Sequence, residues 1–188
     1  FNGLTRTRDA LVHDEPGVTR DRNYGYCRLN PERPFIVCDT GGLSEEDAGL
    51  AAATSKQSWQ AAAEAAVILF IVDAKSGPEV LDYEILKGLR KLSKPMVLVI
   101  NKTDGKNTED AIHDFADFGF THVLPIAAAH QRGVPELLEL ILEILPERAE
   151  PEAAEDDGIM RLAFIGRPNV GKSTLVNRLL GEERVIAS

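Results

Sequence analysis

The chain has 188 residues, of which 44% are hydrophobic and 27% are charged, and its formal net charge is −9. This composition is typical of a globular protein and excludes a disordered or fibrous chain. The acidic balance excludes a polyanion-binding surface over the whole molecule, because affinity for nucleic acid comes mostly from Lys and Arg side chains that neutralise phosphates.

Short apolar runs alternate with segments of helical spacing along the first three quarters of the chain. Residues 23–29 alternate apolar and polar side chains and predict an antiparallel edge strand. Further on, Val, Ile and Leu dominate runs that predict buried parallel strands, and the segments between them predict helices. The alternation indicates an α/β fold, a mostly parallel sheet with helices on both faces. The predicted strands are 34–38, 66–72, 95–100 and 123–126, and the predicted helices are 55–65, 79–92, 108–118 and 134–145.

The composition changes sharply after residue 145. Residues 146–157 carry six acidic side chains, one basic side chain and two prolines without an apolar period, which predicts a solvated linker. Beyond it, residues 161–165 predict a new strand and residues 173–180 a new helix. Residues 158–188 carry five basic and two acidic side chains, so we expect any anionic ligand at this end.

A glycine-rich turn joins this last predicted strand to the last predicted helix. Its sequence from Gly166 to Ser173 matches G-x-x-x-x-G-K-[ST], in the strand–turn–helix context that a phosphate-binding loop requires. The glycines let backbone N–H groups turn toward phosphate oxygens, and the helix N-terminus adds its positive dipole end. Lys172 would reach the β- and γ-phosphates, and Ser173 would offer its hydroxyl to Mg²⁺.

Two further motifs directly follow predicted strands, at the carboxyl edge where open α/β sheets bind ligands. Asn101-Lys102-Thr103-Asp104 ends in a carboxylate that could accept hydrogen bonds from N1–H and the 2-amino group of guanine, a pair of donors that adenine lacks. In Asp39-Thr40-Gly41-Gly42, the Asp could hold Mg²⁺ through water and a Gly N–H could meet the γ-phosphate. Taken alone, each motif is equally consistent with a polar turn.

The order of these motifs resembles that of the translation-factor-related GTPases. Pro16-Gly17-Val18-Thr19-Arg20-Asp21 comes first, followed by the motifs that begin at Asp39 and Asn101. Together with Gly-Arg-Pro-Asn-Val-Gly-Lys-Ser-Thr after an acidic linker, the pattern closely resembles the bacterial Der family, also called EngA. The resemblance implies a P-loop NTPase fold of the Ras-like G-domain type, with two G domains in tandem.

The resemblance also implies roles for individual residues. Thr19 is expected to be the first switch threonine and Gly42 part of the second switch, with Thr19, Asp39 and Ser173 around Mg²⁺ and Lys172, Thr19 and Gly42 serving catalysis. The nucleotide-binding residues are expected to be Gly166, Arg167, Pro168, Asn169, Val170, Gly171, Lys172, Ser173, Thr174, Asp39, Thr40, Gly41, Gly42, Leu43, Asn101, Lys102, Thr103, Asp104, Ala127 and Ala128.

Two positions bear on the details of catalysis and base binding. Leu43 stands where Ras-like enzymes have a water-orienting Gln, so glutamine-based hydrolysis is not expected. In similar GTPases an Asn in the phosphate loop, here Asn169, helps to bind K⁺, which gives a second expected cation. Ala127-Ala128 replaces the usual Ser-Ala of the family, so the side-chain hydroxyl is lost while the backbone N–H toward guanine O6 remains.

The resemblance also predicts the domain organisation. Residues 1–145 would be a first G domain without its initial strand and phosphate loop, residues 146–158 a linker, and residues 159–188 the first strand, loop and helix of a second G domain. Two alternatives stay open. Residues 159–188 could be only the start of the second domain, or they could supply the missing strand, loop and helix to residues 1–145, within one molecule or between two copies, since the linker can span roughly 40 Å.

The expected function is a GTP-binding molecular switch that hydrolyses GTP and acts in assembly of the large, 50S ribosomal subunit. Any contact with ribosomal RNA would be made through parts outside this chain. Alternatives are a guanine-nucleotide-binding module without turnover and a tRNA-modifying GTPase, the latter disfavoured because such proteins carry one G domain. Cys27 and Cys38 do not suggest a disulfide framework, and no apolar run reaches the length of a membrane span, so we expect a cytoplasmic protein without a membrane partner.

Overall fold

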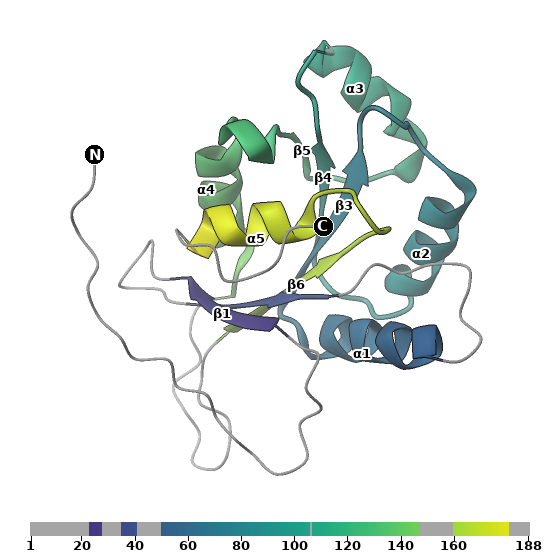
Figure 1. The fold of residues 1–188 in the computed structure, drawn as a ribbon, viewed down its shortest axis with the longest axis vertical. Helices are drawn as coiled ribbons and strands as arrows, with labels where there is room; N and C mark the ends of the chain where they lie inside the picture. The colour runs from purple at the N-terminus through teal and green to yellow at the C-terminus, as the bar shows by residue number, and fades with distance from the viewer. Residues whose placement is uncertain (1–22, 28–34, 41–49, 106, 147–159, 181–188) are drawn as a thin grey trace, which may run out of the picture.

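A computed structural model describes residues 23–27, 35–40, 50–105, 107–146 and 160–180 of the chain (Figure 1). Six strands form one sheet in the order β1-β2-β6-β3-β4-β5. β1 is antiparallel to β2, and the other neighbouring pairs are parallel. The strands are β1 (Asn23–Cys27), β2 (Phe35–Asp39), β3 (Val67–Asp73), β4 (Met96–Asn101), β5 (Val123–Pro125) and β6 (Met160–Ile165).

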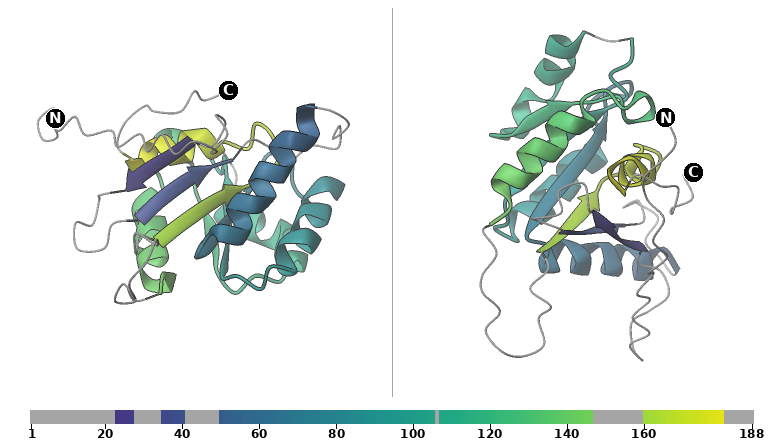
Figure 2. Two further views of the ribbon diagram at one scale, coloured as in Figure 1. Left: turned by 90° about the horizontal axis from the view of Figure 1, so that it is seen from below. Right: turned by 90° about the vertical axis from the view of Figure 1, so that its left-hand side faces the viewer.

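Helices cover both faces of this sheet (Figure 2). α4 and α5 lie against one face, and α1, α2 and α3 against the other. The predicted α/β fold class is therefore confirmed. The helices are α1 (Leu50–Glu64), α2 (Val80–Arg90), α3 (Thr108–Asp114), α4 (Val134–Ile144) and α5 (Lys172–Leu180), with short 3-10 turns η1 (Ala116–Phe118) and η2 (Ala128–His130).

The two cores follow from the alternation of side chains along each strand. In β3, Leu69 and Ile71 pack with the α4 and α5 residues, while Phe70 and Val72 pack with those of α1, α2 and α3. All four side chains are completely buried. This is why the central strands appear in the sequence as continuous apolar runs rather than as alternating ones.

β6 occupies the centre of the sheet although it follows every other described strand in the sequence. It pairs with β2 through Val37 opposite Leu162, and with β3 through Leu69 opposite Phe164. The fold thus follows the alternative in which this segment supplies a strand, loop and helix to the preceding residues, here within one chain. Its assignment to a second G domain stays a prediction.

The helix predicted for residues 108–118 is wrong over its last turn. α3 ends at Asp114, Phe115 leaves helical geometry with φ −104° and ψ 12°, and η1 follows. The tighter turn brings the rings of Phe115 and Phe118 into edge-to-face contact, with 5.3 Å between the ring centroids, and both side chains are buried. The other predicted elements agree with the structure to within two residues, with two exceptions. α1 begins at Leu50 rather than at residue 55. The predicted strand 23–29 can be compared only in part, because residues 28 and 29 lie outside the described ones.

The structure also describes the two cysteines and the character of the helices. Cys27 and Cys38 are buried, and the Cys27 thiol donates to the carbonyl of Leu179 in α5. Among the described helices, none combines the length and apolar character needed to cross a bilayer.

Candidate nucleotide-binding site

The carboxyl ends of four parallel strands meet at one edge of the sheet. Asp39 ends β2, Asp73 ends β3, Asn101 ends β4, and Gly166 directly follows β6. The strand register places Asp73 beside Asn101 and Asp39 beside Phe164. Open α/β sheets bind their ligands at this edge, because loops from neighbouring strands separate there.

The loop between β6 and α5 follows a path that needs glycine at two positions. A Cβ on Gly166 would lie 2.3 Å from the carbonyl oxygen of Ile71, and one on Gly171 would lie 2.3 Å from Asn101 Nδ2. Gly171 also has φ +95°, and Asn169 adopts the left-handed conformation with φ 62°. The loop is therefore held tightly against β3 and the loop after β4, and it delivers the chain to the N-terminus of α5, where backbone N–H groups favour anions.

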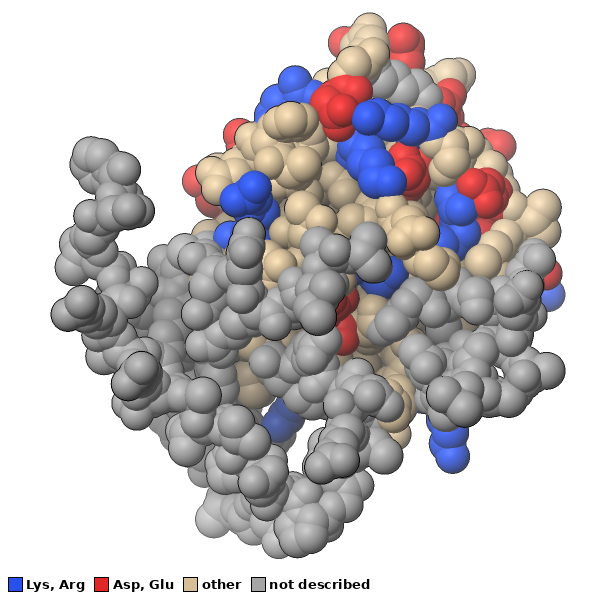
Figure 3. Space-filling view, viewed as in Figure 1, with Lys and Arg blue, Asp and Glu red and all other residues tan. Residues whose placement is uncertain are grey.

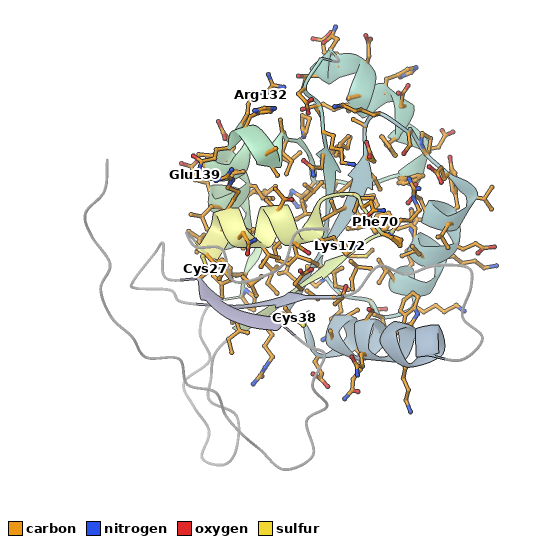
Figure 4. The ribbon with its side chains drawn as sticks, viewed as in Figure 1. Cys27, Cys38, Phe70, Arg132, Glu139 and Lys172 are labelled. Carbon is orange, nitrogen blue, oxygen red and sulfur yellow. The ribbon has the colours of Figure 1, made fainter. Side chains whose placement is uncertain are left out.

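Lys172, the first residue of α5, lies inside this loop (Figure 4). Its Nζ donates to the carbonyl of Arg167 at 2.8 Å, which wraps the side chain under the loop. Only 6% of the residue is exposed. Burial lowers the pKa of Lys172 to about 8, while the negative charge of Asp39 acts in the opposite direction. An anion at the loop would restore the charged form.

The carboxylate of Asp39 is the acidic group whose charge raises the pKa of this lysine. Burial raises the pKa of Asp39, and a hydrogen bond from Ser173 together with the charge of Lys172 opposes the increase. Its Oδ1 atom is buried and, among the residues that the structure describes, has no hydrogen-bond partner. A buried carboxylate oxygen without a donor is costly unless a ligand satisfies it. The carboxylate of Asp39 and the hydroxyl of Ser173 are oxygen ligands of the kind that Mg²⁺ prefers, and the Mg²⁺ site expected at Thr19, Asp39 and Ser173 stays a prediction.

Asn101 connects three loops through one side-chain amide. Its Nδ2 donates to the carbonyl of Val170 at 2.7 Å, and its Oδ1 accepts from the N–H of Ala128 at 3.1 Å. The amide therefore joins the base loop (residues 101–104) to the phosphate loop (residues 166–173) and to η2. Of the two residues Ala127 and Ala128, whose loop was expected to offer a backbone N–H to guanine O6, Ala128 directs its N–H at this amide.

The other residues of the base loop divide into buried and exposed ones. Thr103 is buried, and its hydroxyl donates to the carbonyl of Ile126 at 2.8 Å, which anchors the loop within the protein. Lys102 has φ 62°, and its Nζ contacts both Asp73 Oδ2 and the carbonyl of Asn169 at 2.7 Å. Asp104 is 38% exposed and forms an ion pair with Lys75 at 2.8 Å. The hydrogen bond from Lys75 lowers the pKa of Asp104 below its ordinary value.

Arg167 fastens the phosphate loop to the start of α2. Its Nε donates to Asp82 Oδ1 at 2.7 Å, its Nη1 contacts Glu79 Oε2 at 2.6 Å, and its Nη2 donates to Ser76 Oγ at 3.1 Å. Asp82 is completely buried, and it also accepts from the backbone N–H of Glu79 in a capping box. Arg167 is therefore the cation that makes this buried carboxylate tolerable.

The structure brings together most of the predicted site, but part of it lies outside the described residues. Thr19, Gly41, Gly42 and Leu43 belong to that part. Thr40 is buried and its hydroxyl donates to the carbonyl of Phe164, a structural contact. Pro168 and Asn169 are exposed at the tip of the loop, and Thr174 is half-buried in the first turn of α5.

Three residues outside the predicted motifs contact them, namely Asp73, Lys75 and Asp82. Asp73 could have been found, because it ends a predicted strand at the same edge as Asp39 and Asn101. Lys75 and Asp82 lie beyond the strand end, and no spacing rule points to them. Figure 3 shows Lys and Arg side chains interspersed with Asp and Glu over the described part of this face, rather than a continuous basic patch.

Comparisons with known proteins agree with this geometry. The sequence model of a family described as 50S ribosome-binding GTPase matches residues 1–102 and 161–188. The whole chain is 58% identical to a GTPase Der of Stenotrophomonas maltophilia and 59% identical to one of Xanthomonas oryzae, and it spans 41% of the length of each. The resemblance to the Der family is thereby confirmed.

Solved structures of Era proteins show the same fold. Aquifex aeolicus Era bound to GDP and AlF4⁻ has a TM-score of 0.64 and 32% identity, and an Era in complex with MgGDPNP and a segment of 16S ribosomal RNA has a TM-score of 0.62 and 33% identity. In both cases the match covers 73% of this chain and 48% of the other. The fold, the converging loops and the match over both parts of the sequence establish that the chain belongs to the family of 50S ribosome-binding GTPases.

Proposed function

We propose that this chain binds guanine nucleotides at the edge where β2, β3, β4 and β6 end, and that the intact protein hydrolyses GTP as a molecular switch. The single observation that carries the proposal is the double contact of Asn101 with Val170 and Ala128. It holds the base loop and the phosphate loop in one arrangement, as a ligand with a base at one end and phosphates at the other requires.

Each part of a nucleotide has a partner in this arrangement. The loop N–H groups and the N-terminus of α5 would face the phosphates, with Lys172 directed at the β- and γ-phosphate oxygens. Asp104 would accept from N1–H and the 2-amino group of guanine, and an adenine base would leave this carboxylate without its donors. Affinity for GDP should therefore greatly exceed affinity for ADP.

Asp39 and Ser173 would hold Mg²⁺, which supplies positive charge next to the β- and γ-phosphates when bound. A hydrogen bond from Ser173 lowers the pKa of Asp39, which indicates that the two side chains are neighbours at this edge. Lys172 and the loop amides would stabilise the charge that develops when water attacks the γ-phosphate in line. Thr19 and Gly42 are proposed to complete this group from the two switches.

A role for K⁺ at Asn169 is proposed in addition. Its support is the exposed position of Asn169 at the tip of the phosphate loop, with a left-handed backbone that turns the loop at this residue. Hydrolysis by the intact protein should be faster in KCl than in NaCl. Equal rates in the two salts, with unchanged GTP affinity, would exclude the proposal.

The nucleotide proposal is tested by fluorescence titration of the chain with a labelled GDP and competition with unlabelled nucleotides. Wild-type protein should bind GDP and not ADP. Asp104→Asn replaces one acceptor by an NH₂ donor, and it should shift the preference toward xanthosine diphosphate, which has a carbonyl where guanine has its 2-amino group. Equal competition by ADP and GDP would show that the base loop does not read guanine.

Turnover distinguishes the switch from its rival, a binding module that retains nucleotide without hydrolysis. Phosphate release should be measured on the chain and on the intact protein under the same conditions. Release by the intact protein supports the switch. Tight GTP binding by the intact protein without release of phosphate would favour the binding module.

The partner is proposed to be the 50S ribosomal subunit or its precursor, and the location the cytoplasm. The support is the family description, which names 50S binding, while the neighbouring Era structure contains 16S ribosomal RNA. The GTP-bound and GDP-bound states would differ in the order of the switch loops, and this difference would be read by the partner. Co-sedimentation of the intact protein with large-subunit particles should depend on which nucleotide is bound, and independence from nucleotide would count against it.

A further inference from the structure

The loop that follows β3 contacts the base loop although none of its residues belongs to a predicted motif. Lys75 Nζ lies 2.8 Å from Asp104 Oδ2, across 29 residues of sequence. β3 and β4 are neighbours in the sheet, so their following loops run side by side at the carboxyl edge. The contact is therefore a direct product of strand order.

Asp73 holds the backbone of this lysine in place. Its Oδ1 accepts the backbone N–H of Lys75 at 2.8 Å, and its Oδ2 accepts Lys102 Nζ at 2.7 Å. Asp73 is 15% exposed in its side chain, whereas Lys75 and Asp104 are 57% and 38% exposed. The less exposed carboxylate thus anchors the backbone from which the long, exposed side chain of Lys75 reaches Asp104.

We propose that Lys75 is a positioning residue for guanine recognition, which holds the Asp104 carboxylate in the orientation that accepts the two donors of the base. This inference rests on the proposed function of the same site. Guanine offers N1–H and the 2-amino group side by side, so both carboxylate oxygens must face the base in one plane. An exposed carboxylate rotates freely about its terminal bond, and a lysine bound to one oxygen restricts that rotation.

Lys75 and guanine can share the carboxylate. Each carboxylate oxygen has two lone-pair sites, so Oδ2 can accept from Lys75 and still accept from the base. The hydrogen bond from Lys75 also lowers the pKa of Asp104, although an aspartate is ionised at neutral pH without it. What the lysine contributes is therefore the direction of the carboxylate that the two guanine donors require.

The test is a double-mutant cycle on the full 188-residue chain, with Lys75→Met, Asp104→Asn and the double variant, titrated with GDP and with xanthosine diphosphate. Lys75→Met should weaken GDP binding roughly two- to fivefold, the range for one exposed charge pair. The same change in the Asp104→Asn background should leave xanthosine diphosphate binding unaltered, because the neutral amide has no charge for Lys75 to hold. Lys87→Met, an exposed lysine on α2, is the matched control and should bind GDP as wild type does.

The possible outcomes separate this inference from the proposed function. Unchanged GDP binding by Lys75→Met would overturn the inference. Tighter GDP binding would overturn it too, because it would mean that Lys75 competes with the base for Asp104. An equal loss in both backgrounds would also overturn it, since Lys75 would then act on the nucleotide directly or through the fold. If wild-type protein bound ADP as well as GDP, the proposed function would fail, and this inference with it.

An independent readout is the titration of Asp104 itself. In Lys75→Met the pKa of Asp104 should rise toward its ordinary value, observed by NMR of the side-chain carboxyl carbon. The thermal unfolding midpoint should not change, because the residue is exposed. A Lys75→Met protein with an unshifted Asp104 pKa would show that the contact does not form in solution.

Discussion

The guanidinium of Arg167 donates from Nε to the buried carboxylate of Asp82 at 2.7 Å, although 85 residues of sequence separate the two. Removing one member of a buried pair leaves the other charge uncompensated. We therefore expect Arg167→Met to lower the free energy of unfolding by about 3 kcal/mol, measured by urea denaturation. This value is at the lower end of the range for buried pairs, because the arginine is itself partly exposed. Lys56→Met, which removes an exposed charge on α1, should change stability by less than about 0.5 kcal/mol.

The same variant should show a characteristic dependence on pH. Burial already raises the pKa of Asp82, and loss of Arg167, which opposes this increase, should raise it further. Between the ordinary pKa of aspartate and this raised value, the native state binds more protons than the unfolded state, so the stability of the variant should fall as pH rises through that window. Adding Asp82→Asn to Arg167→Met should recover stability at neutral pH. A stability loss that is independent of pH and of residue 82 would contradict the ion-pair explanation.

Gly171 is expected to tolerate no side chain. Gly171→Ala would place a Cβ 2.3 Å from Asn101 Nδ2, in addition to the strain of a residue with φ +95°. The contact of Asn101 with Val170 should break, so GDP affinity should fall at least tenfold, measured by titration. Gly77→Ala is the matched control, because Gly77 has φ +70° with nothing within 4 Å of an added Cβ. It should cost only the conformational strain, about 1–2 kcal/mol of stability, with GDP affinity retained.

Nucleotide binding should weaken in alkaline solution through Lys172. Because burial lowers the pKa of Lys172 to about 8, this lysine loses its charge as pH rises beyond that value. Phosphate binding favours the charged form, so affinity for GDP should decrease by up to about tenfold per pH unit above pH 8, with proton uptake on binding. Calorimetry in two buffers of different ionisation enthalpy measures that uptake. Lys172→Arg keeps its charge and should show neither effect, while the guanine base titrates equally in both proteins.

Residues 160–180 should be indispensable for folding of the rest of this chain. β6 pairs with β2 and β3, and its Leu162 and Phe164 side chains are completely buried in the core beneath α4 and α5. A chain that ends at residue 146 would leave β2 and β3 each with one unpaired edge and would expose that core, so it should lack a cooperative unfolding transition and aggregate. Circular dichroism and calorimetry check this. A shortened chain with a cooperative transition close to that of the full chain would contradict the central position of β6.

The fold was largely predictable because buried strands and amphipathic helices have periods that short windows of sequence reveal. The three motifs were predictable for a similar reason, since each lies within a few residues directly after a strand. Contacts such as Arg167 with Asp82 or Lys75 with Asp104 join segments far apart in sequence, and their geometry depends on strand order. The order itself could not be deduced, because the apolar run at residues 161–165 fits a central strand of this sheet as well as the first strand of a separate domain.

The position of β6 also has a consequence for the order of events during synthesis. Every other described strand is synthesised before it, so the edges of β2 and β3 that pair with β6 lack this partner until residue 165 has been made. Closing the sheet then joins residues more than 120 positions apart, as between Val37 and Leu162, which makes it a slow step dominated by loop closure. Until that moment the core formed by the described residues is incomplete, and apolar surface exposed in this way favours aggregation.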